Sequence, residues 1–479
     1  MHRMFVAALA GVSLVAAPAA AQKTATISAK DKAQGAQYHP QFLAQYGGAM
    51  TGPQAAYVER VGKRVAVQSG LSNAQGDFTV TLVDSPVENA FAIPGGYVYV
   101  TRQLLALMNS EAELASVLGH EIGHVAARHS NKRNSRSTLA SILAAGVGAV
   151  TGSDALGQIA GYGSQLYTLG YSRSQEYEAD GLGIRYMTTA GYDPYAAASM
   201  LTALDSGTKL QARIAGRADQ QVPGWASTHP NSADRVARAR TLAGKQTRAV
   251  RASGEDSAFL RMLDGLPYDD SPQQGVVEGR VFSHPMLKLR FTAPAGFTLA
   301  NATDAVTISG SNGQARFEGG PATADLPAYV TQRFTALAGN NAGNRQLHGE
   351  IRRTRINGLD AAYATGRASS NGKAVDVTIV AYRFPAATYQ FTVVTPSGAG
   401  LGALAPLVES MTPLSDAQAA QIRTRRIRIV PVRAGDTIDS LSARMAYADY
   451  RRERFMTLNA LGAGDTLRPG RLVKLVVTD

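Results

Sequence analysis

Residues 120–129 read H-E-I-G-H-V-A-A-R-H, and the interpretation of the whole chain starts from this stretch. On an α-helix, His120 and His124 leave the same face one turn apart, so both imidazoles can bind a single metal ion. Glu121 follows the first histidine directly, where its carboxylate can polarise a water on that metal without being a ligand. The stretch therefore predicts a helix that carries a metal centre. An exposed amphipathic helix with two histidines would give the same letters, so the rest of the chain decides between them.

The composition restricts the ligands that such a metal can have. The 479 residues are 45% hydrophobic and 18% charged, an ordinary globular composition with room for roughly two to four domains. The sequence contains no cysteine, so disulfides and thiolate ligands are excluded and a metal site must use histidines and carboxylates. The formal net charge of +12 favours anionic surfaces such as cell-wall polymer or lipopolysaccharide.

Residues 1–21 have the three regions of a secretory signal peptide. A basic start is followed by the apolar run Met4–Ala17 and by three alanines before Gln22. We therefore expect an exported protein that is periplasmic, or else secreted or bound to the cell wall, and nucleic acid is not an expected partner. The Ala- and Gly-rich stretch Thr138–Tyr162 is interpreted as a close-packed helix or flap rather than a membrane span, and peripheral membrane contact is left open.

Two extended runs precede the metal helix. Phe78–Val83 alternates as F-T-V-T-L-V, which predicts a strand. Asn89–Val100 predicts either a second strand that bends at its Pro-Gly-Gly triplet or a plain hairpin. An edge strand beside the metal helix has free backbone groups that can pair with an extended peptide, so Asn89, Ala90 and Phe91 are candidate substrate contacts.

A second acidic segment follows the metal helix. Residues 172–180 read S-R-S-Q-E-Y-E-A-D, and Glu176 and Asp180 share a helix face whereas Glu178 points elsewhere. A zinc ion that holds two imidazoles needs a third protein ligand and an open position for water, and a carboxylate from a second helix can be that ligand. Asp180 would then accept the N–H of a ligating histidine. A solvated acidic helix face would show the same spacing.

Four motifs resemble, in the same order, those of the HtpX and CAAX-prenyl-protease type zinc metallopeptidases, a gluzincin family. The motifs are N-A-F-A-I-P-G-G at 89–96, E-L-A-S-V-L-G-H-E-I-G-H at 113–124, S-R followed by E-x-x-A-D at 172–180, and T-H-P at 228–230 with Arg235 downstream. Together they are far more specific than H-E-x-x-H alone. The chain lacks the multiple spanning helices of the membrane-embedded relatives, so it resembles the soluble periplasmic, BepA-like branch, although without a helical-repeat tail.

The resemblance implies a zinc site with one ion per chain. Its expected ligands are His120, His124 and Glu176. Glu121 would be the catalytic base, and Asp180 would support a ligand from behind. His229, the histidine of T-H-P, would stabilise the oxyanion or approach the zinc as a latch. Arg235 would anchor that loop or contact the substrate backbone.

The expected architecture is an α+β multidomain protein. Its parts are a mainly helical zincin domain with a small edge sheet at 29–245, a linker at 246–280, an α+β domain of unknown role at 281–415 and a βααβ module at 427–479. The last part carries the series V-x-x-G-D-T, L-N-x-L and L-x-P-G and is similar to a LysM module. That similarity implies binding to glycans that contain N-acetylglucosamine, but bracing of the protease is an open alternative.

The expected function is hydrolysis of peptide bonds in exported or misfolded envelope proteins by a zinc metalloendopeptidase. Two alternatives from other classes stay open: a non-proteolytic glycan-binding wall protein and a non-proteolytic factor for outer-membrane assembly. The sequence predicts neither the physiological substrate nor the oligomeric state.

Overall fold

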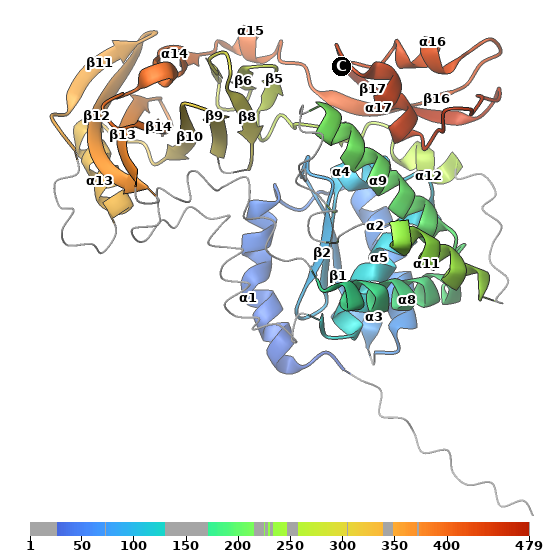
Figure 1. The fold of residues 1–479 in the computed structure, drawn as a ribbon. Coiled ribbons are helices and arrows are strands. Elements are labelled where there is room, and N and C mark those ends of the chain that lie inside the picture. Colours follow the sequence, from blue (N-terminus) through green and yellow to red (C-terminus); the bar gives the residue numbers. More distant parts are fainter. Residues whose placement is uncertain are drawn as a thin grey trace, which may run out of the picture.

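The computed structural model describes residues 26–71, 73–129, 171–214, 225, 229, 233–246, 257–303, 305–338, 348–370 and 373–478. The expected signal peptide and the stretch 138–162 lie outside the described residues. Figure 1 shows a helical domain at the lower right, a β-rich middle domain at the upper left and a C-terminal module at the upper right. Among the helices of the described part, none is long and apolar enough to cross a bilayer.

The helical domain is built around a three-stranded sheet. Its strands are β1 (Thr79–Val83), β2 (Ala90–Ile93) and β3 (Tyr97–Thr101), in the order β1-β3-β2. β3 pairs in parallel with β1 and antiparallel with β2, so β2 is an edge strand. The Pro-Gly-Gly triplet turns the chain between β2 and β3, and the second extended run is therefore a hairpin rather than one bent strand.

Alternation along the strands gives each face of this sheet its own helices. Val98 and Val100 pack with α2 (Pro53–Ala66) and α5 (Glu111–Ala126), whereas Tyr99 packs with α1, which spans Ala29–Gln45. Successive side chains of a strand point to opposite faces, which explains this division. The sheet therefore separates α1 from the predicted metal helix α5. The remaining short elements near it are η1 (Val67–Ser69) and α3 (Ala74–Asp77).

Helix α5 follows α4 (Arg102–Leu107) after a short junction. Its N-cap is Ser110, whose hydroxyl accepts the backbone N–H of Glu113, and Glu111 and Glu113 occupy its first turn. Carboxylates favour the positive end of a helix dipole, so this local sequence fixes the start of the metal helix. The other long helices of the domain are α8 (Arg173–Thr189), α9 (Ala196–Ile214) and α11 (Ala233–Gly244).

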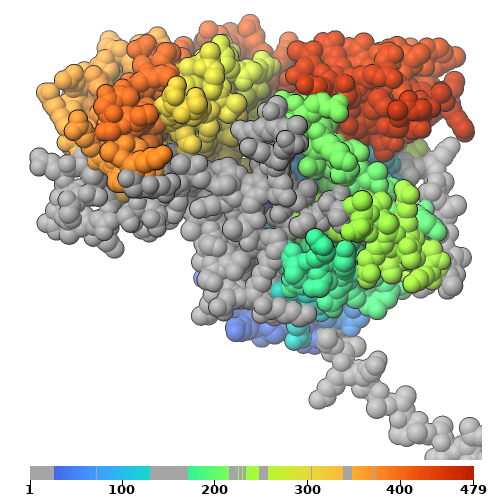
Figure 2. Space-filling model, in the orientation of Figure 1, coloured from blue at the N-terminus to red at the C-terminus, as the bar shows by residue number. Residues whose placement is uncertain are grey.

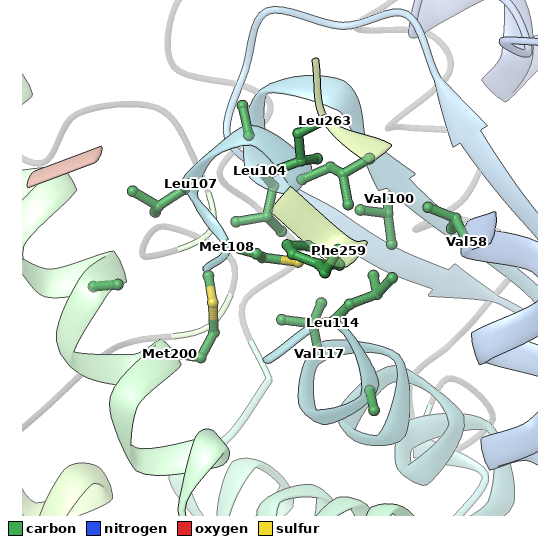
Figure 3. Close-up of a cluster of buried hydrophobic side chains, with 14 of the residues drawn as sticks. Val58, Val100, Leu104, Leu107, Met108, Leu114, Val117, Met200, Phe259 and Leu263 are labelled. Atoms are coloured by element: carbon green, nitrogen blue, oxygen red, sulfur yellow. The ribbon is translucent and has the colours of Figure 1, made fainter. Parts of the chain in front are cut away.

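Part of the segment expected as a linker is core. Within 246–280 the chain forms α12 (Ser257–Met262), β4 (Pro267–Tyr268) and β5 (Val276–Glu278), the last of which belongs to the middle domain. Phe259 and Leu263 are buried against α4, α5 and α9, as Figure 3 shows. The polar composition of the surrounding residues conceals these apolar anchors, so the linker expectation does not hold for 257–268.

The middle domain consists of two antiparallel sheets. The larger has the strand order β11-β12-β13-β14-β10-β9-β8, and the smaller has the order β15-β7-β6-β5. Helix α13 (Leu326–Ala338) covers β12 and β13. The strands are β5 (Val276–Glu278), β6 (Val281–His284), β7 (Leu289–Thr292), β8 (Thr298–Asn301), β9 (Ala305–Gly310), β10 (Gly313–Gly320), β11 (Arg352–Ile356), β12 (Leu359–Ser370), β13 (Lys373–Arg383), β14 (Thr388–Pro396) and β15 (Thr412–Pro413). The short helices η5 (Gly402–Leu404), α14 (Ala405–Glu409) and α15 (Asp416–Ala419) lead out of it.

The C-terminal module has the expected element order. It runs β16 (Arg425–Pro431), α16 (Ile438–Ser442), α17 (Arg451–Leu458) and β17 (Leu472–Thr478), with β16 and β17 antiparallel. Strand β4 adds a third member to this sheet by pairing with β16, where two strands were expected. The assignment of the module to the LysM type remains a prediction.

Candidate metal centre

Four buried side chains converge on one point in the helical domain. They are His120 and His124 from α5, Glu176 from α8 and His229 from a separate segment. One donor atom from each lies within 4.8 Å of all the others. The three ligands expected from the sequence are thus brought together, and His229 joins them.

The close approach of α5 and α8 makes this convergence geometrically feasible. A Cβ at Gly183 would lie 2.8 Å from the backbone nitrogen of His120, and one at Gly119 would lie 3.0 Å from the Gly183 carbonyl oxygen. Glycine at these positions removes the side chains that would separate the two backbones. Glu176 and Asp180 of α8 therefore reach the histidines of α5.

The distances between donors fit a single tetrahedral zinc ion. Zinc binds imidazole nitrogen and carboxylate oxygen at about 2.0–2.1 Å, so donors at tetrahedral corners are about 3.3–3.4 Å apart. His120 Nε2 lies 3.0 Å from His124 Nε2 and 3.3 Å from His229 Nδ1. Glu176 Oε1 lies 3.5 Å from His124 Nε2 and 3.0 Å from His229 Nδ1. These residues suit one Zn²⁺ per chain.

His120 is held from behind by a buried ion pair. Its Nδ1 lies 3.0 Å from Asp180 Oδ1, and Arg235 contacts the same carboxylate with Nε and a terminal nitrogen at 2.9 and 2.7 Å. Arg235 also lies 2.8 Å from Glu176 Oε2. Burial lowers the pKa of His120, but its hydrogen bonds to Asp180 and Glu176 outweigh this effect and raise the pKa to about 9. The arginine therefore links both acidic residues of α8.

His124 has a different support. Its Nδ1 lies 2.8 Å from Nδ1 of His129, and His129 Nε2 lies 3.1 Å from Glu178 Oε2. Arg128, at φ +54°, ends α5 in the left-handed region and turns the chain back so that His129 lies beneath the helix. Burial and the neighbouring histidines lower the pKa of His124, which favours the neutral imidazole that binds metals.

Glu121 is the buried acid of the site whose carboxylate accepts no hydrogen bond from the described residues. Neither carboxylate oxygen has a hydrogen bond within the described residues, and Oε1 lies 3.5 Å from His229 Nε2. Burial raises the pKa of Glu121, although His229 and His120 act in the opposite direction. An unpartnered buried carboxylate is costly for the fold and is typical of a group that awaits a substrate or a water.

Residues 53–243 match the model of peptidase family M48. This part of the chain is a peptidase family M48 domain. The mitochondrial metalloendopeptidase OMA1 of Schizosaccharomyces pombe is 31% identical over 202 residues, which cover 41% of this chain and 56% of the relative. The beta-barrel assembly-enhancing protease of Escherichia coli O157:H7 is 33% identical over 211 residues, covering 42% of this chain and 41% of the relative. The chain thus spans about half the length of these curated relatives.

The similarity of this chain to solved structures is weak. A Bacteroides thetaiotaomicron protein of known structure covers 42% of this chain with 8% identity and a TM-score of 0.25. The M48 domain is defined by its sequence match and by the geometry of its metal centre.

Two aromatic residues of the M48 domain escaped the sequence reasoning. Tyr171 stacks on His124 at 3.8 Å between ring centroids, and Trp225 stacks on His229 at 4.1 Å. The backbone N–H of Trp225 donates to the carbonyl of Glu88 at 2.7 Å, just before edge strand β2. Trp225 is the sole tryptophan of the chain and lies four residues before His229. This position close to a predicted site residue could have indicated that Trp225 belongs to the site.

The candidate substrate contacts divide into two groups. Ala90 and Phe91 lie on edge strand β2, but only Phe91 is partly exposed, because Ala90 is fully buried in the core; Phe91 stacks on Tyr99 at 4.6 Å. Asn89 is buried and exchanges backbone and side-chain hydrogen bonds with Thr101. Arg235 is 1% exposed and lies behind the ligands, where its third contact, at 3.5 Å, is the His229 carbonyl. Its position suits anchoring of the His229 loop and leaves no surface for substrate.

Proposed function

We propose that the chain is a zinc metalloendopeptidase. The observation that carries this proposal is the convergence of four metal donors next to Glu121, a buried carboxylate without a hydrogen-bond partner among the described residues. The M48 match and the metalloendopeptidase and protease named among the relatives support it. When bound, zinc supplies Lewis-acid chemistry that lowers the pKa of water to about 7 and polarises a carbonyl.

Glu121 is proposed to move the proton. Its carboxylate accepts a proton from the attacking water and delivers it to the nitrogen of the leaving amine. The raised pKa that burial gives Glu121 suits both halves of this transfer, because it brings the pKa of the carboxyl closer to neutral. Asp180 and Arg235 hold His120, so that the donor set stays fixed while the proton moves.

We infer that the described arrangement is a closed form. His229 Nδ1 occupies the fourth donor position, 3.3 Å from His120 Nε2, and a fourth protein ligand leaves no open position for water. His229 would have to leave this position before hydrolysis. After it moves, its imidazole is available to stabilise the oxyanion, so the latch and catalytic roles can alternate in one side chain.

The edge strand β2 is the proposed docking site for the peptide. Its outer edge has no partner strand among the described residues and can pair with an extended substrate through backbone hydrogen bonds. Phe91 is the partly exposed contact, whereas Ala90 is fully buried in the described arrangement. In the described arrangement, the Trp225 N–H already pairs with the Glu88 carbonyl at the start of this strand. Release of His229 and access to β2 are therefore expected to occur together.

For the substrate class we propose exported or misfolded envelope proteins, with the protein itself in the periplasm. The proposal is supported by the signal-peptide pattern of residues 1–21 and by relatives named beta-barrel assembly-enhancing proteases. A non-proteolytic assembly factor is the rival, since a permanently latched site would hydrolyse nothing.

The test uses wild type, Glu121→Gln and His229→Ala, with Glu59→Gln on the exposed face of α2 as the matched control. We measure zinc content and the cleavage of casein and of an unfolded outer-membrane protein. Glu121→Gln should keep one zinc per chain and lose about 10²–10⁴-fold in kcat, whereas the control should equal wild type. Wild type without zinc, or equal cleavage by wild type and Glu121→Gln, would refute the proposal. Faster cleavage by His229→Ala indicates the latch, and slower cleavage indicates the oxyanion role.

A further inference from the structure

The C-terminal module shares its core with the M48 domain. Buried residues of both parts form one continuous hydrophobic cluster, to which the module contributes Ile427, Phe455 and Leu475. Figure 2 shows the module seated on the region of α9, and α17 contacts both α9 and α4. Strand β4, which precedes the middle domain in the chain, completes the sheet of the module. A domain tethered by a linker would have none of these shared contacts.

Lys474 on β17 enters the M48 domain. Its side chain is fully buried, and its ammonium donates to the carbonyls of Ala106, Leu107 and Met108 at 2.7, 3.1 and 2.7 Å. An ammonium has three donors, and all three are used here. The acceptors are the final carbonyls of α4, where the helix dipole is negative and a cation is favoured. Burial lowers the pKa of Lys474, and Glu113 of α5 acts in the opposite direction.

The strand that carries Lys474 is itself fixed. Asn459 accepts the backbone N–H of Lys474 at 2.7 Å and donates to its carbonyl at 2.9 Å. Residues 473–476 are all buried, so both faces of β17 are covered. Since alternate side chains point to opposite faces, Lys474 and Val476 share one face of β17 and Val473 and Leu475 the other, and the contacts of Lys474 place its face against α4.

Both ends of helix α4 are contacted by the sheet β17-β16-β4 or by the residue that follows β4. At its start, Arg102 donates to the carbonyl of Pro267 at 3.3 Å, and Gln103 accepts the backbone N–H of Asp269 at 3.0 Å. At its end, Lys474 holds the last carbonyls. The chain then passes through Met108 to the N-cap of α5, the helix that carries the metal ligands and Glu121. The module therefore constrains the junction from which the metal helix starts.

The geometry points to Lys474 as a positioning residue of the metal centre: the C-terminal module is a built-in brace that fixes the α4–α5 junction and through it the helix of His120 and Glu121. The inference deepens the proposed peptidase function and rests on it only for the catalytic readout. The basic residues of β16 agree with bracing, because Arg425 and Arg428 pair with Asp269 and Asp264 of the preceding segment. Both ion pairs join the module to the segment before the middle domain, and the Arg428–Asp264 pair is solvent-exposed.

The experiment compares full-length wild type with Lys474→Met, which keeps the length of the side chain and removes the ammonium. Arg444→Met, an exposed cation of the same module, is the matched control for the change in charge. Three quantities are measured well below the Tm of each variant: the Kd for zinc by chelator competition, backbone hydrogen exchange across residues 104–118, and kcat and KM on casein per folded molecule.

Lys474→Met should weaken zinc binding about tenfold, the scale known for residues that orient metal ligands, and should speed exchange at the α4–α5 junction. Its kcat should fall while KM changes little, and Arg444→Met should match wild type. A lower Tm with unchanged zinc affinity and unchanged exchange would overturn the inference, since it would show a merely stabilising role. If the Met variant does not fold, Lys474→Gln, which retains two donors, is measured in the same way.

The readouts separate this inference from the proposed function. If wild type binds zinc but cleaves nothing, the peptidase proposal fails, yet zinc affinity and hydrogen exchange still decide whether Lys474 positions α5.

Discussion

The two helix histidines of the metal centre are supported in opposite ways. His120 is backed by Asp180 and Arg235, both of which are buried. His124 is backed by His129, which is buried, and then by Glu178, whose side chain is 51% exposed. The residues behind His120 therefore form an ion pair inside the protein, whereas the residues behind His124 lead to a carboxylate that is exposed to solvent.

This difference teaches where the rigidity of the site comes from. We call Asp180 and Arg235 the dry support of His120. Removing the charge of either residue leaves the other buried and uncompensated, which typically lowers the stability of the fold by about 3–5 kcal/mol. We call His129 and Glu178 the wet support of His124. Solvent can replace the Glu178 carboxylate, because an exposed ion pair contributes only about 0.2–1 kcal/mol to stability. We therefore expect the Asp180 side to control metal binding and the Glu178 side to modulate it weakly.

Asp180→Asn should have the largest effect of the three variants that test this contrast. The amide keeps the shape of the carboxylate but removes the charge that pairs with Arg235 and orients His120. Zinc affinity should fall about 10–100-fold, as for other residues that hold a ligating histidine. Competition with a chelator measures this. Wild-type affinity in the variant would mean that the dry support does not orient His120.

Arg235→Lys should have an intermediate effect. Lysine retains the charge but cannot contact Asp180 with two nitrogens while also reaching Glu176, since it has a single charged nitrogen. An unsatisfied buried oxygen costs about 1–3 kcal/mol, so the midpoint of urea unfolding should fall and zinc affinity should weaken less than in Asp180→Asn. A variant as stable as wild type would show that the fork of the arginine is dispensable.

Glu178→Gln should have the smallest effect. Its carboxylate accepts from His129 at a half-exposed position, and water can take its place. Zinc affinity should change less than about fivefold, which corresponds to the upper limit for an exposed pair. A loss as large as that of Asp180→Asn would reverse the contrast and place the control of the site on the His124 side.

The sequence predicted the site better than its surroundings for a physical reason. His120, Glu121 and His124 follow from helix periodicity within one turn, so no tertiary information was needed. The contact of Tyr171 with His124 and that of Trp225 with His229 depend on how separate segments pack. The inward turn of His129 depends on the left-handed conformation of Arg128, which is unusual for arginine and left no sequence signal.

In the middle domain, residue composition decides which strands the sequence can predict. The runs 374–384 and 389–394 are rich in valine and aromatic residues, which is typical of strands, and they form β13 and β14. The sequence does not indicate strand β12, because L-D-A-A-Y-A-T-G-R-A-S-S contains mostly small residues of low strand propensity, nor strand β10, which has three glycines. Both strands form through pairing with neighbours already in the sheet.

The pairing of β4 with β16 has a consequence for how the domains are connected. Tyr268 lies directly opposite Arg425, so the whole middle domain enters and leaves between two adjacent strands, about 5 Å apart. In topological terms it is an insertion at the tip of a β-hairpin. Such an insertion can be gained, exchanged or excised without breaking the parent structure, provided that a tight turn closes the gap. The M48 domain and its C-terminal module therefore form one structural unit, from which the middle domain projects as a loop-like insertion.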